Sequence, residues 1–304
     1  MKFFAKAFIT AALYSFLCGA AVAAPVQTQL TADVMDYDME TGVFKARGNV
    51  TLVREGVTMV APFGEAFVQT SKARMWSPAH AYGIYQNEKL DAVCTQIEAD
   101  FSVPGADILM NGEVDALFGD RVLKSDTARL VGKVFSATNV THFEDKSRAV
   151  VISCEKIDGD YDNAGVRVVT GTGHVVAVRE EEARTSRLWC EKLVYSRAES
   201  TTTATGTPRM RIEQRQGGGP RDTLIEGDAL VHSSLHNTVT STGRARAVQD
   251  GRNIRAQRLI YDMASGKIEA RGTPRITVDL SKRGQQRGNS GSDTQKKGQK
   301  RSGS

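Results

Sequence analysis

The chain has 304 residues, of which 40 are Lys or Arg and 35 are Asp or Glu, giving a formal net charge of +5. This is long for one domain, although all-β domains often exceed the usual size of roughly 100–200 residues. The first 23 residues carry +2 and the segment 281–304 carries +6, which leaves residues 24–280 at 5 − 2 − 6 = −3. Bulk charge therefore argues against nucleic acid as a partner.

Residues 1–23 have the features of a cleavable signal peptide. Lys2 and Lys6 precede an apolar run over 7–21, and Ala21-Val22-Ala23 fits the small residues that a signal peptidase recognises. The apolar run is too short for an ordinary membrane-spanning helix. We therefore predict an exported protein; an uncleaved N-terminal anchor is the alternative.

The stretch 30–61 predicts a strand–turn–strand–turn–strand unit. Apolar and polar residues alternate strictly from Phe44 to Leu52, which is typical of a strand with one buried face and one face in water. Turns are expected at 39–42 and 55–56, where Gly42 and Gly56 permit positive φ. The residues expected to face inward are Leu30, Ala32, Val34, Phe44, Ala46, Gly48, Val50, Leu52, Val57, Met59 and Ala61.

Degenerate copies of this unit follow along the chain. Tyr37-Asp38-Met39 and Ala46-Arg47-Gly48 recur as Tyr261-Asp262-Met263 and Ala270-Arg271-Gly272, with 11 positions from Tyr to Gly in both. A fuzzy repeat of roughly 30 residues indicates stacked β units that cannot bury their apolar faces alone. With Gly48 as the marker, the copies are marked at 48, 112, 138 (a Thr), 173, 206, 243 and 272. The inward residues expected in the last copy are Ile268, Ala270, Gly272, Ile276 and Val278.

The marker positions also predict how the strands are arranged. Glycine inside a strand often marks a bend, and Pro208 and Pro274 follow two of the markers. We therefore predict an all-β fold in which one antiparallel sheet is folded over into two facing layers. The charged segment Arg179–Leu188 is expected to be a helix or a loop, and Gln216–Pro220 a loop tip. Residues 281–304 lack large apolar side chains and are expected to form a disordered basic tail, which is either solubilising or attracted to anionic lipid head groups.

No motif in the sequence predicts catalysis. His232 and His236 lie in strand sequence, where they would be about 13 Å apart, so we expect no metal site. Nucleophile elbows and phosphate-binding glycine loops are missing from the sequence as well. Cys94, Cys154 and Cys190 remain after export; Cys154 and Cys190 either form a disulfide or stay as buried thiols. The apolar interior is either an ordinary packed core or a space that opens to hold acyl chains.

The stretch 30–61 resembles the OstA-like (LptA) family of periplasmic lipopolysaccharide-transport proteins. The resemblance rests on Ala32-Asp33, Tyr37-Asp38, Gly42 and Ala46-Arg47-Gly48-Asn49-Val50. It recurs over 255–278 and is weaker in between, which implies that residues 24–280 form one OstA-like domain with degenerate internal repeats. It implies an open, folded-over antiparallel β-jellyroll in the periplasm, which carries the acyl chains of lipopolysaccharide in its interior. It also implies no enzyme activity and no cofactor.

The resemblance further implies a lipid-binding groove and docking edges. The implied partners are lipopolysaccharide, an inner-membrane transport complex and an outer-membrane translocon, with strand-edge pairing near Leu30 and Ile276. The same edges imply a possible head-to-tail homo-oligomer. A non-enzymatic β-repeat scaffold of the cell envelope without lipid cargo is the alternative function, and a β-solenoid polysaccharide enzyme would need a charged cluster that is not evident. The groove residues would be Leu30, Ala32, Phe44, Ala46, Val50, Leu52, Met59, Ile268, Ala270 and Ile276.

Overall fold

A computed structural model describes residues 28–162, 165–215 and 221–278. The predicted signal peptide, the loop tip at 216–220 and the basic tail lie outside these residues. The described residues form twenty strands and two short 3₁₀ segments, Val68–Thr70 (η1) and Lys146–Arg148 (η2), without an α-helix. The predicted all-β class is thereby confirmed.

The strands follow one another with short connections. Their bounds in the first half are β1 Gln29–Thr31, β2 Val34–Asp38, β3 Val43–Arg54, β4 Val57–Phe67, β5 Lys72–Tyr85, β6 Glu88–Asp100, β7 Asp107–Phe118, β8 Arg121–Val131, β9 Val134–Asp145 and β10 Val150–Asp162. Those in the second half are β11 Gly165–Glu181, β12 Arg184–Ser196, β13 Thr201–Thr205, β14 Arg209–Gln214, β15 Arg221–Glu226, β16 Ala229–Ser233, β17 Thr238–Gln249, β18 Arg252–Asp262, β19 Ile268–Arg271 and β20 Arg275–Val278.

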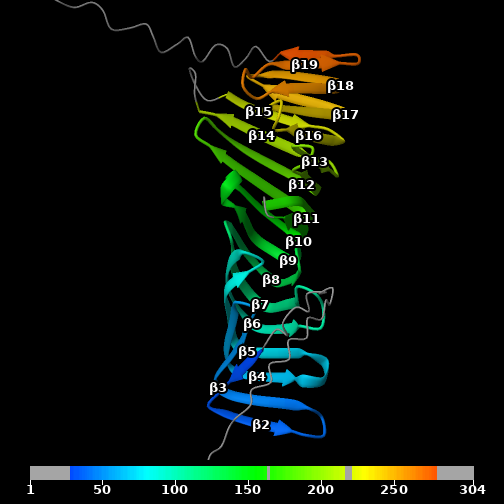
Figure 1. The fold of residues 1–304 in the computed structure, drawn as a ribbon. Helices are drawn as coiled ribbons and strands as arrows, with labels where there is room; N and C mark the ends of the chain where they lie inside the picture. The colour runs from blue at the N-terminus through cyan, green and yellow to red at the C-terminus, as the bar shows by residue number, and fades with distance from the viewer. Residues whose placement is uncertain (1–27, 163–164, 216–220, 279–304) are drawn as a thin grey trace, which may run out of the picture.

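All twenty strands belong to one antiparallel sheet. Figure 1 shows them stacked along a long axis, from β2 in blue at one end to β19 in orange at the other. Where a strand is interrupted, its two pieces pair with the same neighbour, as β13 and β14 do with β12. Pro208 and Pro274 lie in two of these interruptions, as predicted, because proline cannot donate a ladder hydrogen bond.

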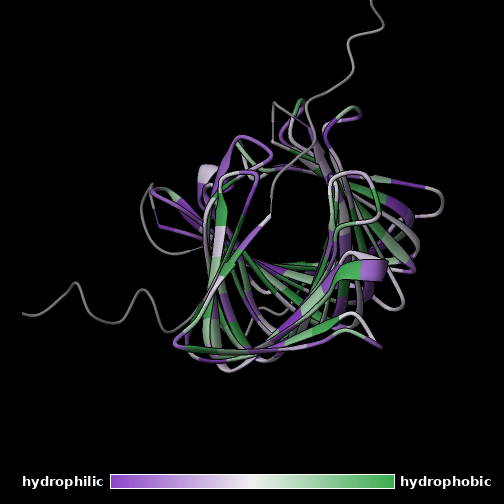
Figure 2. Ribbon diagram, turned by 60° about the horizontal axis from the view of Figure 1, so that its bottom comes forward, coloured by the Kyte–Doolittle hydropathy of each residue, from purple (hydrophilic) through white to green (hydrophobic). Residues whose placement is uncertain are grey.

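The long strands turn a corner near their middle and continue in a second layer. The register of β3 and β4 shifts between Arg47 and Val50, and that of β11 and β12 between Thr172 and Val175. The marker glycines lie at these corners with φ between 74° and 86°, a conformation that glycine adopts without a steric cost. Figure 2 shows the resulting two walls, joined along one side. The prediction of an open, folded-over sheet is therefore confirmed.

Polar side chains reinforce the corners from the neighbouring strand. An acid on that strand contacts the residue that follows the marker: Asn49 Nδ2 donates to Asp33 at 2.9 Å, and Asn139 Nδ2 donates to Asp126 at 2.8 Å. His174 Nδ1 lies 2.7 Å from Glu155, and Arg244 Nε donates to Asp228 at 3.0 Å. The repeated Asp or Glu before each of these corners therefore stabilises the bend.

The space between the layers is filled by apolar side chains along most of the stack. Val50, Ile157 and Ile212 have no exposed surface, and they belong to one continuous cluster. In β3 the inward residues Ala46, Val50 and Leu52 are buried, whereas the outward Lys45 and Arg47 are exposed. The period-two pattern predicted for this strand is thus confirmed.

The inward face predicted for the first strand is wrong after Ala32. Asp33 lies at a corner, where its backbone N–H donates to the Gly48 carbonyl at 2.8 Å. The chain therefore changes face, and Met35 pairs with the inward-facing Ala46, while Val34 pairs with the outward Arg47 and is exposed. Before the corner, Leu30 pairs with Leu52, as expected.

The segment Arg179–Leu188 is neither a helix nor a long loop. Strand β11 continues to Glu181, and β12 begins at Arg184 after a two-residue turn. The charged residues lie at the hairpin end of two paired strands, with Arg179 opposite Ser186. Glu180 and Arg187 are exposed on the outer face there, whereas Arg179 is partly buried and Ser186 is buried.

On the side opposite the corners, side chains reach from one layer to the other. Tyr85 Oη donates to the Gly105 carbonyl at 2.5 Å, and Arg184 Nη1 donates to the Met263 carbonyl at 3.1 Å. The Arg148 guanidinium lies 4.5 Å from the centre of the Tyr195 ring. These contacts hold the open side of the folded sheet together at intervals.

Candidate functional site

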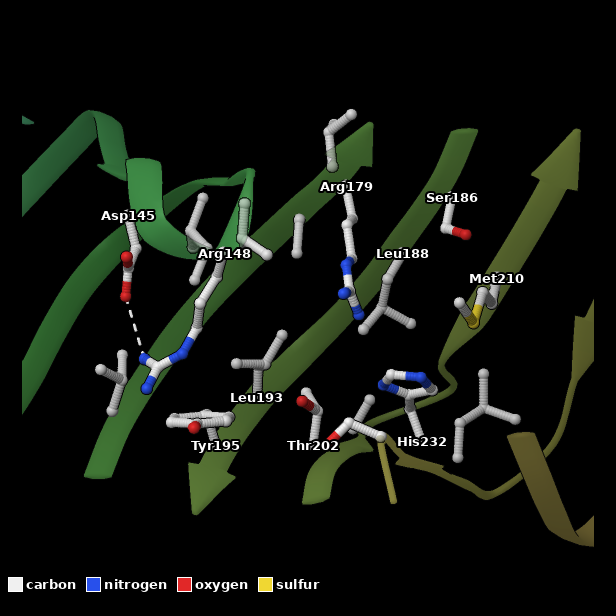
Figure 3. Close-up of a pocket in the computed structure, with 18 of the residues that line it drawn as sticks. Asp145, Arg148, Arg179, Ser186, Leu188, Leu193, Tyr195, Thr202, Met210 and His232 are labelled. Atoms are coloured by element: carbon white, nitrogen blue, oxygen red, sulfur yellow. Dashed lines mark hydrogen bonds and ion pairs between the residues drawn. The ribbon is translucent and has the colours of Figure 1, made fainter. Parts of the chain in front are cut away.

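A cavity of about 270 Å³ lies between the layers, among strands β9 to β17. A smaller cavity, of about 60 Å³, is lined by residues of β6 to β10. Phe143 lines both cavities. Figure 3 shows side chains from both layers converging on the larger cavity. Its apolar lining includes Ile152, Val169, Leu188, Leu193, Ala204 and Met210.

Small inward side chains leave this space open. Ala177 and Ser186 face it from one layer, and Thr202 and Ala204 face it from the other. The interior near the N-terminal end also contains buried alanines such as Ala79 and Ala81, but larger residues such as Leu52 and Met59 pack with them in one cluster. Because protein interiors pack densely, a local run of small residues between layers of fixed spacing produces a cavity.

The cavity reaches the surface between two cross-layer contacts. On one side Arg148 donates to Asp145 at 2.9 Å and lies over the Tyr195 ring. On the other side Arg184 Nη1 and Nη2 donate to the Met263 carbonyl and to Asn237 Oδ1. We call the opening between these two contacts the entrance.

Arg179 and His232 face each other just inside the entrance, from β11 and β16 (Figure 3). Arg179 Nη2 forms an ion pair with Glu181 Oε1 at 2.9 Å. By contrast, Arg179 Nε and His232 Nε2 are buried without a hydrogen-bond partner among the described residues. An unpaired buried polar atom costs about 1–3 kcal/mol, so this pair of nitrogens is a candidate ligand site.

Burial lowers the pKa of His232 to about 4, and the positive charges of Arg179 and Arg184 add to this shift. The folded protein therefore takes up this proton only near pH 4, whereas the unfolded chain takes it up near pH 6.5. The contribution of the neutral His232 to the free energy of unfolding is therefore fully present above pH 6.5. It is lost as the pH falls toward 4, and the loss amounts to at most about 3 kcal/mol.

This pH dependence can be assigned to His232 by substitution. We expect His232→Gln to remove most of that loss. The variant should therefore become more stable relative to the unaltered protein as the pH falls. Urea unfolding at pH 7.0 and pH 4.5, followed by tryptophan fluorescence, measures the difference. If the free energy of unfolding fell by the same amount in both proteins, the pH dependence could not be assigned to His232.

The residues predicted from the sequence to line a groove do not line either cavity. Ala46, Val50, Leu52 and Met59 are buried in the packed interior near the N-terminal end, and Leu30 and Ala32 pack against it. Phe44 is partly buried and stacks on Tyr37 with ring centres 4.3 Å apart. At the other end, Ile268 and Ala270 are partly buried, whereas Ile276 is 64% exposed. These positions therefore belong to the two ends of the stack, and the cavity lies between them.

Within the described residues, Cys94, Cys154 and Cys190 are buried free thiols near the corners. Of the two alternatives left open by the sequence, the structure contains the thiols rather than a disulfide. Cys94 and Cys154 donate to the carbonyls of Gln96 and Lys156 at 3.2 and 3.3 Å. Burial raises the pKa of each thiol to about 11, so these thiols remain protonated and unreactive at neutral pH.

Among the described residues, His, Cys, Asp and Glu do not form a group of three or more that could hold a metal ion. His232 and His236 do not act together, because His236 lies in the turn after β16. Sequence reasoning treated His232 only as a possible metal ligand and Arg179 only as part of a charged segment. The sequence feature that could have revealed the site was the single histidine, His232, in an otherwise apolar strand.

Comparison with solved structures gives a structural likeness, whereas the other comparisons find no match. No protein-family model matches the chain, and no curated protein matches it. The crystal structure of LptH from Pseudomonas aeruginosa, described as the LptA homologous periplasmic component of the lipopolysaccharide transport device, is similar with a TM-score of 0.36 and 15% sequence identity. The match covers 44% of this chain and 98% of LptH. Within the described residues, no helix combines the length and apolar character needed to cross a bilayer.

Proposed function

We propose that this chain is a periplasmic lipopolysaccharide-binding protein that shields acyl chains between the two layers of its folded sheet. In this function it passes lipid between an inner-membrane complex and an outer-membrane translocon. It acts by binding alone, without a cofactor or a chemical step. The observation that carries the proposal is the apolar cavity whose entrance is lined by charged residues.

The chemistry of the cavity supports an amphipathic ligand. Each methylene that leaves water contributes about 0.8 kcal/mol, and the lining offers Leu188, Leu193 and Met210 as contacts. Arg148 and Arg179 lie at the outer end of the cavity, where a charged head group would remain near water. An acyl chain attached to a polar head therefore fits the distribution of apolar and charged side chains.

The two ends of the sheet support assembly through strand edges. Strands β1 and β2 pair only with β3, and β19 and β20 pair only with β18, among the described residues. Apolar side chains are exposed there, including Met35 and Tyr37 at one end and Ile276 and Val278 at the other. An unpaired edge can accept a strand of another protein, so these ends are the proposed docking sites for the two membrane complexes or for a second copy.

The sequence-predicted groove residues fit this proposal at the ends of the stack. Phe44 and Leu30 lie next to the first edge, and Ala270 and Ile276 next to the last. A neighbour that pairs with either edge would cover these side chains and extend the interior from one protein into the next. The continuous interior is then the proposed path of the acyl chains.

A photocrosslinking amino acid in place of Leu188 tests the proposal. Leu188 lines the cavity, and the adjacent Arg187 on the same strand is exposed on the outer face. We expect crosslinks to lipopolysaccharide in cells from position 188 and none from position 187, identified by mass spectrometry of lipid A.

Equal labelling at the two positions, or none at either, would overturn lipid binding in the cavity. An absence of labelling at both positions would instead favour the alternative function, a cell-envelope scaffold with a dry interior. The tightly packed N-terminal part of the core is the observation that makes this alternative worth testing.

A further inference from the structure

Three arginines near the entrance share two carboxylate partners. Arg148, Arg179 and Arg184 face two carboxylates, Asp145, which pairs with Arg148, and Glu181, which pairs with the other two. Arg184 uses its remaining nitrogens on the opposite layer. Of these three arginines, Arg179 is the one that has a buried nitrogen without a hydrogen-bond partner among the described residues.

The two unpartnered nitrogens come from opposite layers. Arg179 lies on β11 at the hairpin end of one layer, and His232 lies on β16 of the other, paired with Thr202 and Val239. A neutral imidazole carries one ring proton, and an anion near Nε2 favours the tautomer that places the proton there. Together the two side chains offer N–H groups to one acceptor between the layers.

We propose that Arg179 and His232 bind the phosphate of an acyl lipid at the entrance, with the acyl chain extending into the cavity. This inference rests on the proposed function and identifies the phosphate as the part of the lipid that the two side chains bind. The guanidinium of Arg179 is positively charged and matches the geometry of phosphate oxygens. The apolar lining directly behind the pair favours a phosphate that carries an acyl chain over inorganic phosphate.

The position of the pair also gives the route by which the lipid enters. The entrance opens on the side of the stack, between the Arg148–Tyr195 contact and the contacts of Arg184. A lipid held there by its phosphate enters laterally, through the open side of the folded sheet.

Binding of matched lipids to the full chain tests the inference. Lauroyl lysophosphatidic acid and monolauroylglycerol share an acyl chain and differ in the phosphate, and inorganic phosphate serves as the third probe. We expect the phosphate lipid to bind at least about tenfold more tightly than the neutral lipid, as expected for hydrogen bonds to a charged group. Calorimetry below the critical micelle concentration measures all three affinities.

Substitution identifies the residues responsible. The double variant Arg179→Gln, His232→Gln is expected to lose the preference for the phosphate lipid and to keep its affinity for the neutral one, which also reports that the cavity is intact. Arg179→Lys is expected to restore part of the preference, because it keeps the charge. Arg187→Gln, on the outer face of β12, is expected to change neither affinity.

Each other outcome has a defined meaning. Equal binding of the two lipids by the unaltered protein overturns the phosphate site and leaves the proposed lipid-binding function standing. Binding of inorganic phosphate as tight as that of the phosphate lipid overturns the acyl-lipid assignment. Failure of both lipids to bind overturns the phosphate site and the proposed function together, and loss of both affinities in the double variant assigns the pair a structural role.

Discussion

Val50→Asp is expected to unfold the N-terminal part of the stack. Val50 has no exposed surface, and its Cγ1 lies 2.9 Å from the position that a Cβ on Gly64 would take, so the surrounding interior is full. A carboxylate at this position would find neither water nor a cation. An unpaired charge in such a place costs about 5 kcal/mol, a large share of the total stability of a domain.

Val53→Asp is the matched control for this substitution. Val53 lies on the same strand and is 37% exposed on the outer face, so we expect a loss of about 1 kcal/mol or less. Urea unfolding and hydrogen exchange of β3 to β5 measure both effects. Similar losses for the two variants would show that the interior at Val50 is open to water, contrary to the packing described above.

Gly83→Ala is expected to produce the second large effect. Gly83 has a φ of 133°, and a Cβ there would collide with the carbonyl oxygen of Gly56 in the neighbouring hairpin. That oxygen already accepts a hydrogen bond from the N–H of Ile84 at 3.0 Å. Backbone atoms on both sides must therefore move, and we expect a loss of about 3 kcal/mol or more from the combined strain and overpacking.

Gly132→Ala measures the free-energy cost of a left-handed backbone conformation in the absence of a steric collision. Gly132 also has a positive φ, of 55°, but a Cβ there would meet its nearest neighbour, the Pro104 carbonyl oxygen, at 4.0 Å. We expect a loss of only about 1 kcal/mol from the left-handed conformation. Thermal unfolding of both variants measures the difference, and equal losses would rule out the collision at Gly83.

The folded-over sheet was predictable because its signals are local in sequence. Alternation from Phe44 to Leu52 predicts a two-faced strand, and Gly48 in the middle of it predicts the bend. The error at Val34 arose because the corner at Asp33 has no glycine of its own, so nothing in the local pattern shows that the chain changes face.

The candidate site depends on pairs that local patterns do not reveal. Arg179 and His232 are 53 positions apart in the sequence, and they meet only because the second half of β11 and β16 lie in opposite layers. The size of the cavity likewise depends on Ala177 and Ala204 facing the same space from different layers. Period-two alternation shows that each residue points inward, but it does not show how much room remains between the walls.

The pairing of each strand with its neighbours in sequence has a mechanical consequence. The hydrogen bonds of an antiparallel pair run perpendicular to the strands, so in this stack they run along the length of the molecule (Figure 1). A force that pulls the two ends of the chain apart therefore acts first on the interstrand hydrogen bonds of the outermost strands. These strands separate from the stack one at a time. Under tension the molecule yields gradually from its ends, and the middle, which contains the cavity, is the last part to open.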